Sequence, residues 1–239
     1  LFFKKNKKNG LTLTGEFSNL LNVKKNSLLE ALNLFENVPT DHFSINLEKN
    51  LPLGAGLGGG SADAAAVIRF ITQHFRYQMP SPKDISKIGA DVPACVLSVA
   101  SRVGGIGETV KPIDISEIDL WIVLVNPGIF VSTGSIFEEV TEKHNEPLEP
   151  FTHFCTTDQF IDYLKRQRND LQDIAANKCP EIEKVLDTIE KSQDVLLSRM
   201  SGSGSTCFGL YRSQEFAKRA VSYINKKNNK WWIKFSKVN

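Results

Sequence analysis

A dense glycine loop in the first quarter of the chain is the feature that most restricts its fold. Residues 51–63 read Leu-Pro-Leu-Gly-Ala-Gly-Leu-Gly-Gly-Gly-Ser-Ala-Asp. Glycine loses more conformational freedom on folding than other residues, so this density is tolerated where φ must be positive or a ligand must approach the backbone. The flanking patterns predict a strand at 43–47 and a helix from Ser61 to about Tyr77. The loop therefore predicts a phosphate cradle at a helix N-terminus, in preference to a flexible turn.

Three common phosphate loops fit this segment poorly. Gly54, Gly56 and Gly59 match G-x-G-x-x-G, but no second apolar strand ending in an acidic residue follows the helix, as a dinucleotide fold requires. No Lys-Ser or Lys-Thr pair follows the glycines, which excludes a Walker A loop. The His-Arg-Asp and Asp-Phe-Gly segments of protein kinases are absent from the sequence as well.

The pattern along the rest of the chain indicates two domains, with a boundary near residue 118. Before it we expect a strand at 11–17, a helix that begins with a capping box at Ser27 and Glu30, and a short helix after Ser81-Pro82. After it, four strands and the main helices follow the order β-α-β-β-α-β, which predicts a ferredoxin-like domain. The strands are expected at 121–125, 195–200, 207–211 and 231–238, and the helices around 137 and at 160–164, 180–191 and 213–225.

The composition excludes several classes of protein. The 239 residues carry a net charge of +2 and 41% apolar residues, which is too balanced for a main partner that is nucleic acid or an anionic membrane. The apolar runs are too short to cross a bilayer. The four cysteines lack C-x-x-C spacing, so we expect reduced thiols and a cytoplasmic protein. The basic clusters at 4–8 and 226–230 are interpreted as solvated turns.

Three segments together resemble the motifs of the GHMP kinases, the superfamily of galactokinase, homoserine kinase and mevalonate kinase. The glycine loop is similar to the second motif, and Gly89-Ala90-Asp91-Val92-Pro93 is similar to the segment with the catalytic aspartate. Residues 200–208, Met-Ser-Gly-Ser-Gly-Ser-Thr-Cys-Phe, resemble the third motif. The segments Gly105-Ile106-Gly107-Glu108 and Asn126-Pro127-Gly128 add to the likeness, which covers roughly residues 26–211.

The resemblance implies an α+β, two-domain GHMP kinase fold. Residues 1–118 are expected to form a ribosomal-protein-S5-domain-2-like lobe that binds ATP and carries out catalysis, and 119–239 a ferredoxin-like lobe. The implied reaction transfers the γ-phosphoryl group of ATP, with magnesium, to the 2-hydroxyl of a small molecule, a cytidine-diphosphate-linked methylerythritol. Two alternatives stay open: another small-molecule kinase of the homoserine or mevalonate type, and a catalytically inactive ATP-binding relative.

The resemblance also implies roles for individual residues. Asp91 is the candidate base, because a carboxylate can take the proton of an alcohol nucleophile; the alternative is an Asx turn before Pro93. Ser61 is a possible magnesium ligand, with a helix N-cap as the alternative, and no metal ligand is otherwise assigned. Asp63 is expected to cap the helix and to favour its dipole. The expected ATP-binding residues are Asn26, Lys49, Pro52, Gly54, Ala55, Gly56, Leu57, Gly58, Gly59, Gly60 and Ser61. By composition alone, Asn26 and Lys49 are surface residues.

On the substrate side, Gly202, Ser203 and Gly204 are expected to bring backbone amides to a phosphate, as the opposite wall of one site. Taken alone, this segment is equally typical of a hairpin turn. Phe137 corresponds to an aromatic residue that stacks on the cytosine base, with a helix core position as the alternative. Ser132 and Thr133 are interpreted as helix caps.

The sequence departs from the family pattern in two places. Ala62 stands where many relatives have a second serine, which removes one hydroxyl from the loop. The family's first motif, an Ala-Lys-Ile-Asn-Leu-type strand, and the Gly-Tyr-His segment that reads cytosine do not occur in these 239 residues. We expect both in residues that precede or interrupt the given sequence; the alternative is a truncated or inactive relative.

Overall fold

The computed structural model describes residues 1–5, 10–20, 26–39, 43–142, 145–151 and 153–238. They divide into two compact units. The N-terminal unit comprises 1–53 and 58–113, and the C-terminal unit comprises 54–57 and 114–239. The division thus falls between Ile113 and Asp114, a few residues before the boundary expected at 118, and the segment Gly54–Leu57 belongs to the later unit.

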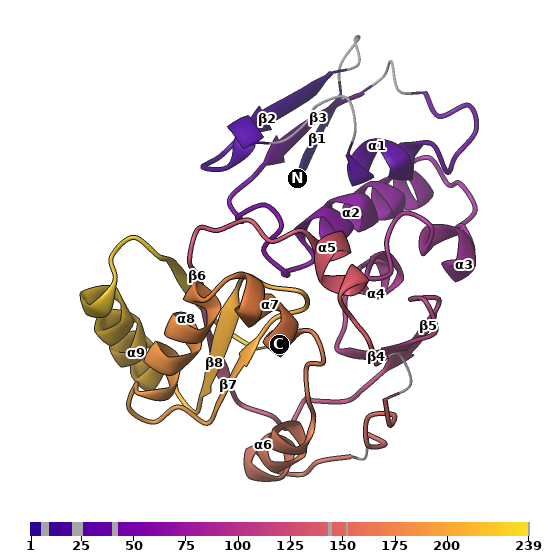
Figure 1. Ribbon diagram of the computed structural model, residues 1–239. Helices are drawn as coiled ribbons and strands as arrows, with labels where there is room; N and C mark the ends of the chain where they lie inside the picture. The colour runs from indigo at the N-terminus through magenta and orange to yellow at the C-terminus, as the bar shows by residue number, and fades with distance from the viewer. Residues whose placement is uncertain (6–9, 21–25, 40–42, 143–144, 152, 239) are drawn as a thin grey trace. The chain divides into compact units, whose positions relative to one another are not determined.

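The N-terminal unit contains a three-stranded sheet, a hairpin and helices. In the sheet, of order β1-β3-β2, the central strand pairs antiparallel with β1 and parallel with β2 (Figure 1). The strands are β1 (Phe2–Lys5), β2 (Leu11–Thr14), β3 (Phe43–Glu48), β4 (Ser101–Gly104) and β5 (Thr109–Pro112), the last two forming the hairpin. The helices are α1 (Ser27–Leu32), α2 (Gly59–His74), α3 (Pro82–Ile85) and α4 (Val92–Leu97), with a 3₁₀ turn at Ser18–Leu20.

Helix α2 forms the centre of the core in this unit. Its buried positions recur at helical spacing, and alanine residues let neighbouring elements pack closely against it. They are Ala64, Ala65, Val67, Ile68 and Ile71. The buried face of β3, at Phe43, Ile45 and Leu47, belongs to the same cluster, because alternate residues of a strand point to one side. Helix α2 and strand β3 therefore share one hydrophobic core.

The C-terminal unit is built on a four-stranded antiparallel sheet of order β7-β8-β6-β9 (Figure 1). The strands are β6 (Trp121–Asn126), β7 (Leu197–Met200), β8 (Cys207–Tyr211) and β9 (Trp232–Lys237). The helices are α5 (Thr133–Glu138), α6 (Thr157–Arg166), α7 (Gln172–Lys178), α8 (Glu181–Glu190) and α9 (Gln214–Lys227). In chain order the sheet reads second, third, first, fourth strand, so the ferredoxin-like prediction is confirmed.

Two hydrophobic clusters cover the two faces of this sheet. Helices α8 and α9 pack on one face, where Val123 and Val125 of β6 belong to the same cluster as Ile182 and Ile224. On the other face, α6 contributes Phe160, Ile161 and Tyr163 to a second cluster that includes Leu210.

Several local predictions need correction. The cap of α1 is Asn26, whose side chain accepts a hydrogen bond from Leu29 N, and the expected cap Ser27 is the first helical residue. Helix α2 begins at Gly59, two residues before Ser61. Lys4 and Lys5 lie in β1, and Lys226 and Lys227 end α9, so these parts of the basic clusters are not turns; residues 6–8 lie outside the described residues.

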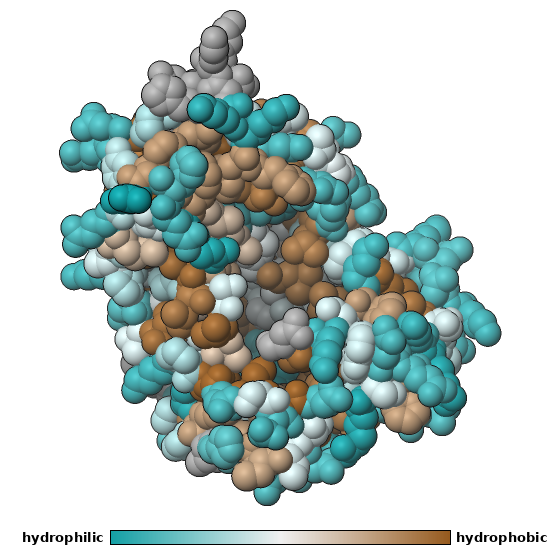
Figure 2. Space-filling view, turned by 180° about the vertical axis from the view of Figure 1, so that it is seen from behind, coloured by the Kyte–Doolittle hydropathy of each residue, from teal (hydrophilic) through white to brown (hydrophobic). Residues whose placement is uncertain are grey.

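No helix within the described ranges is long and apolar enough to cross a membrane. On the face shown in Figure 2, apolar side chains gather in patches that hydrophilic ones separate. The four cysteines are free thiols: Cys95 is half-buried, Cys155 is exposed, and Cys179 and Cys207 are buried.

Candidate active site

The N-terminus of α2 carries no side-chain cap. Its N-cap residue is Gly58, in the left-handed conformation at φ +64°, and no side chain accepts a hydrogen bond there. Ala62 N donates to Gly58 O at 2.8 Å as the first hydrogen bond of the helix. The preceding N–H groups, of Gly59, Gly60 and Ser61, therefore have no partner within the helix. They form the positive end of the helix dipole and can bind an anion. Ser61 lies inside the first turn, so its interpretation as the N-cap is wrong.

The glycine loop before α2 contains the positive φ angles expected of it. Gly54, Gly56 and Gly58 have φ values of +59°, +69° and +64°, which favour glycine. Pro52 and Leu57 are half-buried, and Ala55 is buried. Left-handed glycines therefore alternate along the loop with Ala55 and Leu57, whose side chains are buried or half-buried.

A buried ion pair lies beside the first turn of α2. Lys49 is 5% exposed, and its Nζ atom lies 2.7 Å from Asp63 Oδ2. A Cβ atom at Gly59 would stand 3.5 Å from that Nζ, and one at Gly60 would stand 3.2 Å from Ser27 Oγ. The interpretation of Lys49 as a surface residue is wrong, and Asp63 pairs with Lys49 instead of capping the helix. The ammonium group lies next to the free amides.

Asp91 is the N-cap residue of α4, but its side chain makes no capping hydrogen bond. Its carboxylate is bonded to no other described residue and is solvent-exposed, so the Asx-turn interpretation is wrong. A Cβ atom at Gly58 would stand 3.9 Å from Asp91 Oδ2, which places the carboxylate beside the start of α2. Burial, and next the negative charge of Asp91, raise the pKa of the Cys95 thiol one turn along α4. Asp91 is thus available as a hydrogen-bond acceptor.

The hairpin of β4 and β5 supports the segment that carries Asp91. Gly107 has φ +104°, and a Cβ atom there would lie 2.1 Å from Ala90 O, so only glycine permits this approach. Ile106 N donates to Glu108 Oε2 at 2.7 Å and fixes the hairpin turn. These contacts explain why Gly105-Ile106-Gly107-Glu108 accompanies the aspartate motif.

In the C-terminal unit, the turn between β7 and β8 holds the first half of the glycine loop. Gly202 and Gly204 have φ values of +54° and +85°, and Gly204 N donates to Ser201 O at 2.9 Å. Ser201 Oγ donates to Gly56 O at 2.7 Å, and Thr206 N donates to Ala55 O at 3.2 Å. The second and third motifs are therefore hydrogen-bonded to each other within this unit.

Asn126 supports the far side of that turn. It is 2% exposed, and its Nδ2 atom donates to Thr206 Oγ1 at 2.9 Å and to Ser205 Oγ at 3.3 Å. Its Oδ1 atom accepts a hydrogen bond from Gly128 N at 2.8 Å. No role was predicted for Asn126 itself; the segment Asn126-Pro127-Gly128, which adds to the family likeness, was the available clue.

Other predicted residues have mixed outcomes. Phe137 on α5 is 56% exposed, so its alternative as a core residue is wrong. Ser132 caps α5 as predicted, accepting a hydrogen bond from Ser135 N, whereas Thr133 Oγ1 lies 2.8 Å from Ser203 Oγ and is no cap. The Oδ1 atom of Asn26 accepts the capping hydrogen bond from Leu29 N at 3.2 Å, so this oxygen already has a partner in α1.

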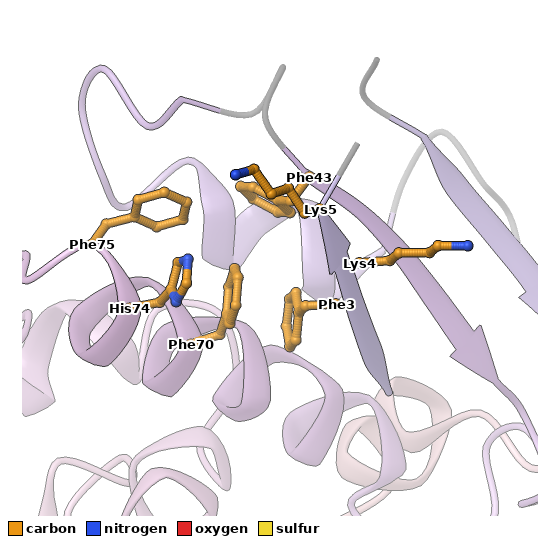
Figure 3. Close-up of a pocket in the computed structure, with 7 residues that line it drawn as sticks. All are labelled: Phe3, Lys4, Lys5, Phe43, Phe70, His74 and Phe75. Atoms are coloured by element: carbon orange, nitrogen blue, oxygen red, sulfur yellow. The ribbon is translucent and has the colours of Figure 1, made fainter. Parts of the chain in front are cut away.

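A cavity of about 490 Å³ in the N-terminal unit contains none of the predicted site residues (Figure 3). Phe3 stacks on Phe70 with ring centroids 3.7 Å apart, His74 lies beside them, and Lys4 extends away from the rings. Across the described ranges no group of three or more His, Cys, Asp or Glu side chains is placed to hold a metal ion.

Two family models match the two parts of this chain. The model of the GHMP kinases N terminal domain matches residues 24–106, and that of the GHMP kinases C terminal domain matches 158–230. The chain belongs to the GHMP kinases.

Within that family, the chain is similar to curated 4-diphosphocytidyl-2-C-methyl-D-erythritol kinases. One from Cereibacter sphaeroides is 37% identical over 190 residues, 79% of this chain and 68% of the relative. One from Wolbachia pipientis is 38% identical over 217 residues, 89% of this chain and 75% of the relative.

Solved structures agree with the sequence comparisons. A crystal structure of 4-(cytidine 5'-diphospho)-2C-methyl-D-erythritol kinase is 26% identical with a TM-score of 0.74, covering 99% of this chain and 83% of that one. Homoserine kinase from Cytophaga hutchinsonii shares the fold at 17% identity, with a TM-score of 0.66 and coverage of 99% and 84%. The predicted α+β, two-domain GHMP kinase fold is confirmed.

Proposed function

We propose that this GHMP kinase transfers the γ-phosphoryl group of ATP to the 2-hydroxyl of 4-diphosphocytidyl-2-C-methyl-D-erythritol, in the non-mevalonate route to isoprenoid precursors. The substrate is supported by the activity for which these relatives are named. The observation that carries the proposal is the Asp91 carboxylate beside the uncapped start of α2. An acceptor for a proton and donors for a phosphate thus occur within one unit.

The start of α2 fits a nucleotide triphosphate. Phosphoryl transfer depends on positioning and on stabilising charge on the phosphate oxygens. The free N–H groups of Gly59, Gly60 and Ser61 supply donors, and Lys49 adds a positive charge whose position Asp63 fixes. The loop residues Pro52 to Gly58 and Asn26 complete the proposed ATP site.

Asp91 is proposed to accept or orient the proton of the substrate hydroxyl. An alcohol is a weak nucleophile, and a carboxylate within hydrogen-bond reach can remove its proton as the bond to phosphorus forms. Because the described residues give the Asp91 carboxylate no hydrogen-bond partner, it needs to break no internal bond to do so.

ATP and magnesium are the cofactors that this reaction implies. The free amides and Lys49 fit the phosphates, while magnesium commonly takes only one or two protein ligands and keeps phosphate and water oxygens. The Ser61 hydroxyl is one candidate ligand. When bound, the ion would neutralise charge on the β- and γ-phosphates.

On the substrate side, the proposal assigns phosphate contacts to Gly202, Ser203 and Gly204. The ring of Phe137 is proposed to stack on the cytosine base, since a mostly exposed aromatic ring offers its face to a planar ligand. The proposed partner is thus a small molecule, and neither a nucleic acid nor a membrane is proposed as a partner. The proposed location is the cytoplasm.

A turnover assay with three acceptors tests the function. ADP release is measured with 4-diphosphocytidyl-2-C-methyl-D-erythritol, homoserine and mevalonate, each with ATP and magnesium. Turnover of the cytidine-linked alcohol alone is expected. Turnover of another acceptor instead would assign a different GHMP kinase activity. Binding of a non-hydrolysable ATP analogue without turnover of any acceptor would indicate an inactive relative.

A further inference from the structure

We propose that Asn169 is a positioning residue for phosphoryl transfer, which fixes the Ser203 amide through the carbonyl group of Gly202. The inference rests on the proposed function, because it concerns the phosphate contacts assigned to the turn between β7 and β8. Asn169 lies just before α7 and was not among the residues that the sequence predicted.

The carboxamide of Asn169 is fully used. Its Nδ2 group donates to Met200 O at 3.0 Å and to Gly202 O at 2.9 Å, while Oδ1 accepts from Leu171 N at 3.0 Å. Both donor hydrogens and one acceptor site are thus engaged. Gln172 Oε1 adds a bond from Met200 N at 2.9 Å. Asn169 and Gln172 therefore hold both ends of the Met200–Gly202 segment by hydrogen bonds.

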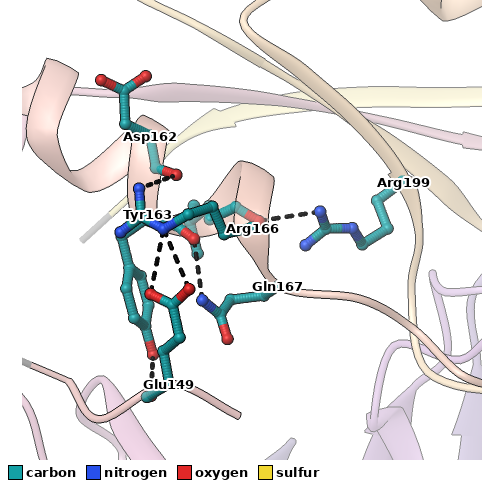
Figure 4. Close-up of polar contacts among 7 residues, drawn as sticks. Glu149, Asp162, Tyr163, Arg166, Gln167 and Arg199 are labelled. Carbon is teal, nitrogen blue, oxygen red and sulfur yellow. Dashed lines mark hydrogen bonds and ion pairs between the residues drawn. The ribbon is translucent and has the colours of Figure 1, made fainter.

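The backbone that carries Asn169 is itself anchored. Arg199 Nη2 donates to Leu164 O at 2.9 Å, and Gln167 Nε2 donates to Tyr163 O at 3.0 Å (Figure 4). Arg166 Nε donates to the Glu149 carboxylate at 3.1 Å. Burial lowers the pKa of Arg199. The end of α6, a few residues before Asn169, is thereby hydrogen-bonded to β7.

The peptide plane carries the effect from Asn169 to Ser203. The carbonyl group of Gly202 and the N–H group of Ser203 belong to one planar trans peptide, and they point in opposite directions. A hydrogen bond that holds Gly202 O therefore also sets the direction of the Ser203 N–H group. Gly202, at φ +54°, would otherwise let this plane rotate.

The Ser203 N–H group is available to a ligand. Ser203 is 6% exposed, yet within the described part of the chain its N–H group has no hydrogen-bond partner. Buried amides are almost always paired, so such a donor points to a bound polar group. Thr133 holds the Ser203 hydroxyl at 2.8 Å, which leaves the backbone amide as the free donor.

The test compares Asn169→Asp with Asn177→Asp in the full chain. Asn169→Asp keeps the acceptor for Leu171 N but sets a carboxylate against two carbonyl oxygens. Asn177 is exposed on α7, so Asn177→Asp makes the same change of charge nearby but outside the turn. We expect kcat to fall about 10- to 100-fold in Asn169→Asp, with the KM for ATP changed less than about threefold. Asn177→Asp should match the wild type.

An amide readout separates positioning from loss of structure. In ¹H–¹⁵N spectra of the wild type, the Ser203 amide should shift on titration with inorganic phosphate, and this shift should disappear in Asn169→Asp while the remaining spectrum stays folded. In Asn169→Ser, which retains one donor, the phosphate-induced shift of the Ser203 amide should lie between those of the wild type and Asn169→Asp. A Ser203 amide that does not respond to phosphate in the wild type overturns the proposal even if every variant unfolds.

The same data distinguish this proposal from the proposed function. If no acceptor is phosphorylated but the Ser203 shift depends on Asn169, the proposed kinase function fails, while the placement of the Ser203 amide by Asn169 stands. Equal kcat, KM and phosphate shifts in wild type and Asn169→Asp overturn the positioning role and leave the kinase function intact.

Discussion

Lys49 Nζ and Asp63 Oδ2 lie 2.7 Å apart, and their side chains are only 7% and 21% exposed. The pair joins the residue after β3 to the first turns of α2. Removing one partner leaves a charge largely excluded from water, so Lys49→Met and Asp63→Asn should each destabilise the chain by about 1–3 kcal/mol. The double variant should lose less than the sum, with a coupling of about 1–2 kcal/mol in urea denaturation.

An exposed pair of the same chemistry is the control. Lys87 and Asp84 are also 2.7 Å apart, but their side chains are 68% and 49% exposed. Their coupling should stay below about 1 kcal/mol, since solvent and salt screen exposed charges. Equal coupling in both pairs would contradict the importance of burial at Lys49.

The second prediction concerns the candidate base. Asp91→Asn keeps the size of the side chain but removes the charge that accepts a proton, so turnover should fall by about 10²- to 10⁴-fold. The Kd for an ATP analogue should change little, as measured by calorimetry. Asp114→Asn is the control, because Asp114 lies outside the predicted site and accepts a hydrogen bond from Ser116 N. Loss of nucleotide binding in Asp91→Asn would show that its role is misassigned.

The third prediction separates backbone strain from collision. Gly56 and Gly128 both have positive φ, at +69° and +76°, but a Cβ atom at Gly56 would lie 2.2 Å from Ser201 O, and one at Gly128 would meet nothing within 4 Å. Gly128→Ala should cost only the strain of about 1–2 kcal/mol. Gly56→Ala should cost about 2–5 kcal/mol in denaturant unfolding, because the glycine loop must also move. Similar losses of unfolding free energy in the two variants would mean that the glycine loop can shift to accommodate the Cβ atom at residue 56.

The fourth prediction is a pH dependence of stability. Burial, with a smaller contribution from Cys179, raises the pKa of Cys207 from 9.0 to about 12. Above pH 9 the unfolded chain releases this proton while the folded chain retains it, so the stabilisation is complete below pH 9 and is lost as pH rises towards 12. The stability of the wild type relative to Cys207→Ala should fall by up to about 1.4 kcal/mol per pH unit in this range. A stability difference between the two proteins that stays constant from pH 9 to pH 12 would contradict this prediction.

The sequence predicted what depends on local pattern. The order of strands after Trp121 gave the ferredoxin-like sheet, because its apolar runs and turns are regular. The hairpin of β4 and β5 was missed, since four-residue strands rich in glycine and charge lack a clear alternation. Helix α7 was missed for a similar reason, being short and without a side-chain cap.

The site was predictable where a motif named the residue and not where a distant partner decided its role. Asp91 and the glycine loop stand in motifs, so the sequence alone could name them as candidates. Lys49 is buried only because Asp63 meets it, and Asn126 acts through Thr206, which is 80 residues away in sequence. Such partners are set by tertiary packing, which no local pattern records.

The bare N-terminus of α2 links the stability of the chain to its ligands. Because Gly58 provides no side chain to satisfy the first amides, an anion that binds there completes the helix only in the folded state. Folded protein is then favoured by an amount that grows with the logarithm of ligand concentration. The rise in melting temperature with phosphate, nucleotides or sulfate should therefore rank these anions by their affinity for the start of α2.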